Sequence, residues 1–198
     1  MGTLYIVATP IGNLEDITLR ALRTLKEVDL ILCEDTRVTK RLLSRYEITT
    51  PTESFHARSE RGKTLKVTRL LEEGKNIALV SDAGTPTISD PGEALVREVR
   101  RHFGEEVQIV TIPGPSAVAA ALSISGVPSS EFLFLGFLPH KKGREKLFAE
   151  VAQTKRTVVF YESPHRILAT LSSLAKHLGQ SRKIAVAREL TKIHEEVR

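Results

Sequence analysis

The chain is organised around one stretch, Val80-Ser81-Asp82-Ala83-Gly84-Thr85-Pro86-Thr87-Ile88-Ser89-Asp90-Pro91-Gly92. The residues just before it, Ile77-Ala78-Leu79-Val80, form a short apolar run, which predicts a strand buried on both faces of a parallel sheet. Pro91 suits the first turn of the helix that apolar spacing predicts to end near Phe103. A loop that merely uses good turn residues would explain the composition, but β-to-α connections usually have about 2–6 residues. The greater length and stiffness favour a ligand-binding loop at the carboxyl end of the strand.

Strands and helices alternate on both sides of this stretch. Apolar runs predict strands at 4–8, 30–33, 77–80, 107–112, 132–138, 157–161 and 183–187. Helical spacing predicts helices at 17–28, 36–46, 64–73, 91–103, 116–125, 143–152 and 164–178, with Asp16 as the cap of the first, Leu19 on its apolar face, and an irregular segment at 49–61. This rhythm predicts an α/β fold with largely parallel sheets and helices on both faces. Pro113-Gly114-Pro115 breaks the chain, so we expect two α/β domains, 1–113 and 114–198.

The composition is that of a soluble globular protein. The chain has 198 residues, of which 41% are apolar and 27% charged. No apolar run approaches the roughly 18 residues that would span a bilayer, and the N-terminus lacks a basic leader. The lone Cys33 lies in an apolar strand and fits a reducing compartment. We therefore expect a cytoplasmic protein, with no membrane partner and no metal, because histidine and cysteine do not cluster.

Basic residues gather in three groups, although the net charge is only +5. A solvated helix face is the more frequent explanation for any one such group. Three of them in a small protein favour an anionic partner, most often the phosphates of RNA or DNA. The groups are Arg37, Lys40, Arg41 and Arg45; Arg58, Arg61, Lys63, Lys66 and Arg69; and His140, Lys141, Lys142, Arg144 and Lys146.

Polar and small residues follow the predicted strands. Because the carboxyl ends of parallel strands meet at one edge of a sheet, these loops can converge on one cleft. Turn formation or helix capping explains each loop taken alone, but hardly all six. The absence of G-x-G-x-x-G, G-x-x-x-x-G-K-[ST] and G-x-S-x-G argues against a Rossmann dinucleotide site, a P-loop and a hydrolase elbow. The loops are Thr9-Pro10-Ile11-Gly12-Asn13, Glu34-Asp35-Thr36-Arg37, Ser81-Asp82-Ala83-Gly84-Thr85-Pro86, Pro113-Gly114-Pro115-Ser116-Ala117, Tyr161-Glu162-Ser163-Pro164-His165-Arg166 and Arg188-Glu189-Leu190-Thr191-Lys192.

These six motifs, in this order, resemble the ribosomal RNA small-subunit methyltransferase I family, a branch of the tetrapyrrole methylase superfamily. The resemblance runs from residue 4 to the last residue. The family usually carries a His-x-His-Asn-Glu-like string in the irregular segment, where this chain has His56-Ala57-Arg58-Ser59-Glu60. Roles of the second histidine and of the asparagine are therefore not carried over. The family also continues past the Glu-Leu-Thr-Lys motif, so we expect the second domain to be truncated at Arg198.

The resemblance implies two stacked α/β domains that hold S-adenosylmethionine in the cleft between them, usually in a homodimer. It implies methyl transfer to the ribose 2′-hydroxyl of a cytidine in small-subunit (16S) ribosomal RNA, presented as RNA or as the 30S subunit. Small residues in the loops would allow a close approach of the backbone to the donor. By this likeness the residues expected at the donor are Ile11, Asp82, Gly84, Thr85, Ser116, Ala117, Tyr161, Ala187 and Leu190.

A ribose hydroxyl is a poor nucleophile, so a general base would accelerate the transfer by about 10²–10⁴-fold. The candidates for this base are Glu34, Asp35, Glu162, Glu189 and Lys192. We choose Asp35 and Lys192 as catalytic residues, and a structural ion pair is the alternative for each. Residues expected to contact substrate are Glu34, Arg37, Lys40, Arg41, Glu162, His165, Arg166 and Arg188. Two other functions stay open: a methylase of a small tetrapyrrole-like substrate, and a catalytically silent RNA-binding relative.

Overall fold

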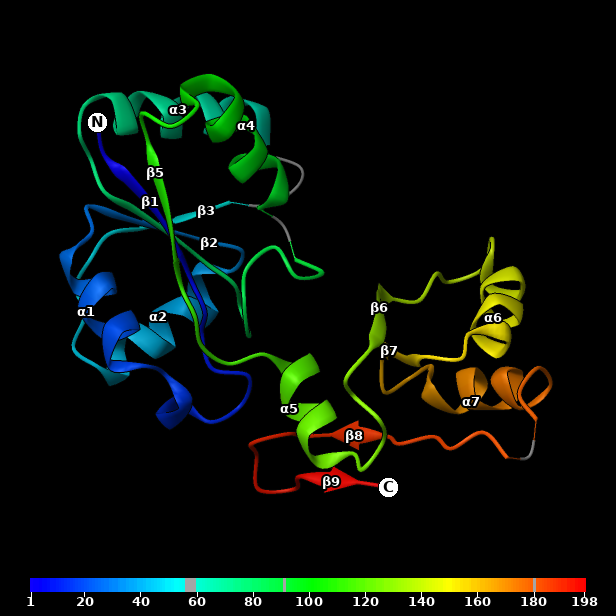
Figure 1. Cartoon of the computed structure of the whole chain (residues 1–198). Coiled ribbons are helices and arrows are strands. Elements are labelled where there is room, and N and C mark those ends of the chain that lie inside the picture. Colours follow the sequence, from blue (N-terminus) through cyan, green and yellow to red (C-terminus); the bar gives the residue numbers. More distant parts are fainter. Residues whose placement is uncertain (56–59, 91, 180) are drawn as a thin grey trace. The chain divides into compact units, whose positions relative to one another are not determined.

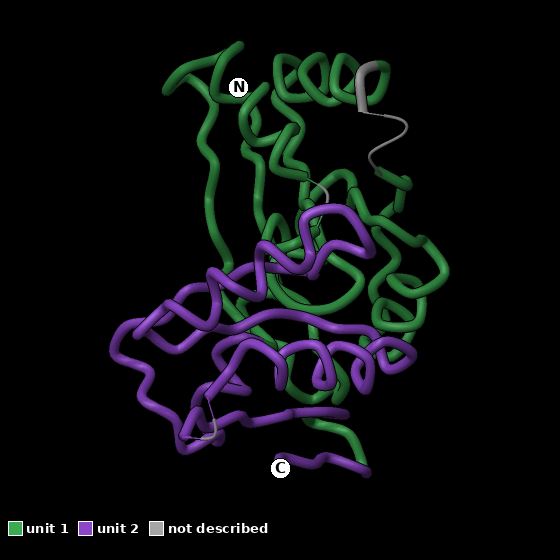
Figure 2. Tube along the Cα trace, turned by 90° about the vertical axis from the view of Figure 1, so that its right-hand side faces the viewer, with its two compact units in different colours: residues 1–117, 190–193 green, residues 118–189, 194–198 purple. Residues whose placement is uncertain are grey.

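The computed structural model describes residues 1–55, 60–90, 92–179 and 181–198. The chain separates into two compact units, which Figure 2 colours separately. Unit 1 comprises Met1–Ala117 and Leu190–Ile193, and unit 2 comprises Val118–Glu189 and His194–Arg198. The predicted domains, 1–113 and 114–198, stay a prediction. Pro91, Arg58 and most of the string at 56–60 lie outside the described residues.

Unit 1 is built on a five-stranded parallel sheet with the order β3-β2-β4-β1-β5 (Figure 1). The strands are β1 (Thr3–Val7), β2 (Leu30–Cys33), β3 (Thr52–Ser54), β4 (Ile77–Val80) and β5 (Gln108–Ile112). The central strand β4 is buried at every position, as its unbroken apolar run predicts. The predicted parallel α/β fold is confirmed here, with one addition. The short edge strand β3 lies inside the segment that was predicted to be irregular.

Two layers of helices cover the sheet, because alternate residues of each strand point to opposite faces. On one face, Ala78 and Val80 pack with α1 (Leu19–Glu27) and α2 (Thr36–Arg45). On the other, Ile77 and Leu79 pack with α3 (Glu60–Glu72) and α4 (Glu93–Phe103) (Figure 1). Burying each of these large apolar side chains contributes about 1.5–3 kcal/mol. Because the connections between these parallel strands cross from one end of the sheet to the other, the loops that follow the strands meet at one edge.

The start of α1 differs from the prediction. Its N-cap is Thr18, whose side chain accepts a hydrogen bond from the N–H of Ala21, rather than Asp16. Asp16 ends a short 3-10 helix, η1 (Leu14–Asp16), which spacing alone does not reveal. Leu19 is the first residue of α1 and is 87% exposed. The predicted inward position of Leu19 is therefore wrong.

Unit 2 contains a parallel pair, β6 (Phe132–Phe137) and β7 (Thr157–Tyr161). The helices α6 (Arg144–Gln153) and α7 (Ile167–Ala175) enclose a small core around Phe148 and Leu174. Helix α5 (Ala117–Ile124) begins at Ala117, which is assigned to unit 1, and its remaining residues are assigned to unit 2. No helix within the described ranges is both long enough and apolar enough to cross a membrane.

The end of the chain departs from the predicted strand at 183–187. Residues 183–186 are not in a strand. Instead β8 (Ala187–Arg188) pairs antiparallel with β9 (Glu196–Val197). The intervening residues Leu190–Ile193 belong to unit 1. An apolar run that contributes to a short hairpin looks, in sequence, like one that enters a parallel sheet.

Candidate functional site

The loops after β1 and β4 are joined directly at the edge of the unit 1 sheet. Thr9 and Gly84 exchange two backbone hydrogen bonds, of 2.9 and 3.0 Å, in an isolated antiparallel bridge. The Thr9 hydroxyl also donates to the carbonyl of Ser81 at 2.9 Å. Since Thr9 and Gly84 are both buried, this bridge holds the two loops in one fixed arrangement.

A small residue at position 84 allows the neighbouring loops to pack closely around this bridge. A Cβ atom at Gly84 would lie 3.4 Å from Cγ2 of Ile11 and 3.7 Å from the carbonyl of Pro115, and its φ of +88° favours glycine. The Thr85 hydroxyl donates to the same carbonyl at 3.2 Å. Gly84 therefore lies beside Ile11, and both Gly84 and Thr85 meet the loop after β5, which continues into Ser116 and Ala117. The structure thus gathers six of the predicted donor residues at this edge: Ile11, Asp82, Gly84, Thr85, Ser116 and Ala117.

Asp35 caps α2 and holds Arg37. Its Oδ1 accepts from the Arg37 backbone N–H at 2.8 Å, and the guanidinium lies against both carboxylate oxygens, with Nη2 at 2.6 Å from Oδ2. The hydrogen bonds from Arg37 lower the pKa of Asp35 to about 2. A carboxylate with so low a pKa is a weak proton acceptor near neutral pH. These contacts do not favour the predicted catalytic role of Asp35, and they occupy Arg37.

The same edge carries further carboxyl groups. Partial desolvation, then a hydrogen bond with Asp90, raises the pKa of Glu34, and the charge of Asp82 adds to the effect. Desolvation likewise raises the pKa of Asp90, against an opposing hydrogen bond with Ser81. Glu34, Asp82 and Asp90 therefore form a group of neighbouring carboxyl groups at this edge, which suits a ligand that carries positive charge.

The long loop after β4 contains backbone strain. Thr87 has φ +73° and Ser89 has φ +62°, both in the left-handed region. A β-branched residue there is unusual, and such conformations cost on the order of 1–3 kcal/mol each. Strained conformations of this kind are more frequent at functional sites than elsewhere.

The segment Leu190–Ile193 returns to unit 1 and covers the loop after β1. The N–H of Asn13 donates to Thr191 Oγ1 at 3.0 Å. A Cβ atom at Gly12 would lie 2.7 Å from Cγ of Lys192 and 2.8 Å from the carbonyl of Leu190. The predicted residues Leu190 and Lys192 therefore lie against Gly12, the residue that follows Ile11 in the loop after β1. Thr191 has φ +66°, so this segment is strained as well.

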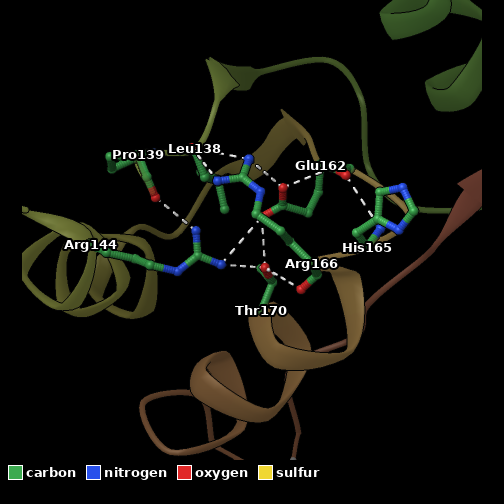
Figure 3. A network of polar contacts seen from close by, with 8 residues as sticks. Leu138, Pro139, Arg144, Glu162, His165, Arg166 and Thr170 are labelled. Carbon is green, nitrogen blue, oxygen red and sulfur yellow. Dashed lines mark hydrogen bonds and ion pairs between the residues drawn. The ribbon is translucent and has the colours of Figure 1, made fainter. Parts of the chain in front are cut away.

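In unit 2, the end of β7 carries a buried carboxylate, Glu162, whose side chain is 2% exposed. It accepts hydrogen bonds from the Ser163 N–H at 2.8 Å and the Thr170 hydroxyl at 2.6 Å, and it pairs with Arg166 at 2.5 Å and Arg144 at 3.2 Å (Figure 3). Burial would raise the pKa of Glu162, but these hydrogen bonds outweigh it and the pKa is lowered. Both of its oxygens are engaged within the protein, which does not favour the predicted contact with substrate.

The remaining predicted residues of unit 2 lie in different surroundings. The ring of Tyr161 packs edge-to-face against Phe134 and at a tilt against Phe137, with ring centroids 5.1 and 5.2 Å apart, and burial raises the pKa of its hydroxyl. His165 is exposed next to the Glu162 network. In β8, Ala187 pairs with Val197, and Arg188 forms an ion pair of 2.8 Å with Glu196. Their roles at a donor or substrate stay predictions.

The basic groups differ in how far they are neutralised. Lys40 and Arg41 are exposed on α2. In the second group, Lys63 hydrogen-bonds Ser54 and Lys66 pairs with Glu53 at 2.5 Å. Sequence reasoning did not identify Gly12, Thr191 or Thr170 as site residues. Gly12 and Thr191 belong to two of the loop motifs quoted above, and this position in a motif is the sequence feature that could have identified them.

Comparison with known proteins gives a consistent family. The family described as tetrapyrrole (corrin/porphyrin) methylases matches residues 3–198. The chain is 50% identical over 196 residues to the ribosomal RNA small subunit methyltransferase I of Thermotoga maritima, covering 99% of this chain and 86% of that protein. It is 52% identical over 198 residues to the protein of the same name from Synechocystis, covering 99% and 70% respectively. The counterpart in Bacillus subtilis is 50% identical and is covered over 66% of its length.

Solved structures show the same fold at lower identity. The methyltransferase CobJ superposes with a TM-score of 0.74 at 21% identity, over 100% of this chain and 85% of that one. The cobalt precorrin-4 methyltransferase CbiF superposes with a TM-score of 0.72 at 18% identity, over 99% and 84%. At these identities the likeness concerns the fold.

Proposed function

This chain belongs to the ribosomal RNA small-subunit methyltransferase I family of tetrapyrrole methylases, and from that premise we propose that it methylates small-subunit (16S) ribosomal RNA with S-adenosylmethionine as donor. The proposed acceptor is the ribose 2′-hydroxyl of a cytidine. The observation that carries this proposal is the joined loop edge of unit 1, where Thr9 and Gly84 are bridged and Asp82 lies half-buried beside them. This edge contains the motifs on which the family resemblance rests.

The residues of this edge fit such a donor. Ser116 and Ala117 are small and half-buried, so an adenine or ribose can approach their backbone closely, whereas Gly84 is buried and lets its loop pack against Ile11 and Pro115. The carboxyl groups of Glu34, Asp82 and Asp90 suit the positive charges of a sulfonium and an amino group. When bound, S-adenosylmethionine supplies an electrophilic methyl carbon to the attacking oxygen. We propose as donor-binding residues Ile11, Asp82, Gly84, Thr85, Ser116, Ala117, Tyr161, Ala187 and Leu190.

Catalysis in this scheme rests chiefly on positioning. Holding the ribose oxygen in line with the methyl carbon removes most of the entropic barrier, because the reaction becomes effectively unimolecular. Lys192 is the proposed catalytic residue, since its segment is fixed against Gly12 and Asn13 beside the donor loops. Asp35 is better placed to fix the start of α2 and the guanidinium of Arg37.

The proposed substrate accounts for the exposed cations of α2, Lys40 and Arg41, as contacts to RNA phosphates. Cytoplasmic location and a homodimer accompany this proposal. A tetrapyrrole-like macrocycle is compact, so its methylase would not need exposed cations along α2 to bind it. A silent RNA-binding relative would retain the cations and lose the donor.

A methyl-transfer assay distinguishes these possibilities. Tritiated S-adenosylmethionine is incubated with the protein and with free small-subunit RNA, 30S particles or a tetrapyrrole precursor. We expect label in the RNA, at a nucleotide that then resists alkaline cleavage because its 2′-oxygen is blocked. Label in the tetrapyrrole alone would overturn the proposed substrate. RNA binding without any label would identify a silent relative.

A further inference from the structure

Glu162 connects two arginines that each hold the same stretch of backbone. Arg144 Nη1 donates to the carbonyl of Pro139 at 2.8 Å. Both terminal nitrogens of Arg166 lie 3.3 Å from the carbonyl of Leu138. Because Glu162 fixes both guanidinium groups, the chain at Leu138 and Pro139 is anchored to a buried carboxylate (Figure 3).

The anchored backbone leads directly into an exposed basic turn, His140–Gly143. His140, Lys141 and Lys142 are all exposed. The turn closes with a hydrogen bond of 3.3 Å from the Arg144 N–H to the Lys141 carbonyl, and Gly143 supplies the left-handed conformation, φ +82°, before α6. The turn therefore begins next to Pro139, whose carbonyl Arg144 holds, and it ends next to Arg144 itself.

The charge of the turn is not neutralised locally. The carboxylates of α6 are used elsewhere, since Glu145 lies 3.0 Å from His177 and Glu150 lies 3.9 Å from Lys146. Within the described residues, no carboxylate forms an ion pair with His140, Lys141 or Lys142. The network beneath the turn adds two guanidinium groups against one carboxylate. This local excess of positive charge is complementary to a polyanion.

We propose that the turn His140–Gly143 contacts phosphates of the RNA substrate, and that Glu162 is a positioning residue for it, acting through Arg144 and Arg166. This inference rests on the proposed function, because it takes RNA as the polyanion. It assigns Glu162 an indirect role in place of direct contact with substrate. Lys141 and Lys142 are the proposed phosphate contacts.

The first test changes the charge of the turn. Lys141→Gln and Lys142→Gln are combined and compared with a matched pair, Lys155→Gln and Lys176→Gln, exposed cations in the same unit. Binding of a small-subunit RNA fragment is measured by filter retention at several salt concentrations. Because each phosphate contact contributes about 0.7–0.9 to the slope of log K against log[salt], the first pair should lower the slope by about 1.4–1.8. The control pair should leave it unchanged.

Calorimetric titration with S-adenosylmethionine separates this inference from the proposed function. Donor affinity should be the same in the parent and in both pairs. A parent that binds the donor but no RNA would overturn the proposed substrate, and this inference with it. A parent that binds RNA with a slope that the Lys141 and Lys142 changes do not alter would overturn the inference alone. Equal effects of the two pairs would mean a general charge effect, and would also overturn it.

The second test addresses positioning by Glu162. Glu162→Gln removes a negative charge, so electrostatics alone would strengthen RNA binding. Positioning predicts the opposite: weaker RNA binding, with donor affinity kept. Thr170→Val is the companion variant if Glu162→Gln does not fold, because it keeps the carboxylate and removes one donor to it. RNA binding in Thr170→Val should weaken about twofold to tenfold, the range that one hydrogen bond supports. Unchanged or tighter RNA binding in a folded variant would refute the positioning role.

Discussion

The backbone N–H of Asp35 donates a hydrogen bond of 3.0 Å to Oδ1 of Asp82. This contact joins the loop after β2 to the loop after β4, so the edge of the sheet is held together on both sides of the central strand. Asp82 therefore has a structural partner as well as a proposed ligand. The two roles separate in mutants that keep or remove the accepting oxygen.

Asp82→Ala should weaken S-adenosylmethionine binding by about tenfold or more and destabilise unit 1 by about 1–3 kcal/mol, because the Asp35 N–H loses its partner. Asp82→Asn keeps an accepting oxygen, so it should retain stability and still lose donor affinity. Calorimetric titration and thermal unfolding measure the two effects. If Asp82→Asn binds the donor as the parent does, the charge of Asp82 has no part in the site.

The lowered pKa of Asp35 predicts that the stability of the folded state depends on pH. This pKa is lowered from 3.8 to about 2, so the folded state is stabilised above pH 3.8 and loses this contribution as the pH falls through about 2. Asp35→Asn retains a capping side chain but lacks the charge. The parent should therefore exceed Asp35→Asn in stability at pH 5, and the difference should vanish near pH 2. Urea unfolding between these values measures it, and a difference that is constant with pH would contradict the assigned pair with Arg37.

RNA binding should depend on the exposed cations of α2. Replacing Lys40 and Arg41 by glutamine should lower the salt slope by about 1.4–1.8. Replacing Arg23 and Lys26, exposed on α1, is the matched control and should leave the slope unchanged. Arg37→Gln should change it less than Lys40→Gln, because Asp35 already holds Arg37. Equal slopes in all variants would make α2 an ordinary solvated face.

Gly12→Ala should displace the segment Leu190–Ile193, because the added methyl group would lie 2.7 Å from Thr191 Oγ1. We expect a loss of methyl transfer that exceeds the loss of stability. Gly62→Ala is the control, since a Cβ atom there meets nothing within 4 Å. Steady-state kinetics and thermal unfolding compare the two. Parental activity in Gly12→Ala would show that the packing of this segment is irrelevant to catalysis.

Lys192→Met distinguishes the roles of the lysine. As a proton acceptor, Lys192 should support kcat by about 10²–10⁴-fold, and its loss should be partly recovered at higher pH. We expect this pattern, with donor affinity kept. A rise in KM for RNA alone would instead mark a phosphate contact. Parental kcat and KM would leave Lys192 with a structural role only.

Much of unit 1 could be predicted because its signals are local. The four apolar residues of β4 indicate a strand buried on both faces without knowledge of its neighbours. The strand β3 could not be predicted in this way. Thr52-Glu53-Ser54 has no apolar pattern, and it becomes a strand by pairing with Ile31–Cys33 of β2. An edge strand of this kind depends on its partner more than on its own residues.

The candidate site was predictable as a set of loops and unpredictable as a set of contacts. Topology brings Thr9 and Gly84 to the same edge, so the motifs after parallel strands could be grouped. The pairing of Glu162 with Arg144 could not be inferred, because Arg144 begins α6, a separate element, and its sequence marks it only as one member of a basic group. Asp35 was chosen for its carboxylate, and only the geometry reveals that Arg37 occupies it.

The path of the chain through Leu190–Ile193 has a consequence for biosynthesis. Asn13 and Thr191, which are hydrogen-bonded, are separated by 178 residues. At about 5–20 residues per second, translation delivers Thr191 to the nascent protein roughly ten to forty seconds after Asn13. The sheet of unit 1 can form in that interval, since α/β domains fold within about milliseconds to seconds. On the ribosome, the segment Leu190–Ile193 therefore cannot cover the loop at Gly12 until the rest of unit 1 has been made. This segment, which carries Lys192, is the last part of unit 1 to be added.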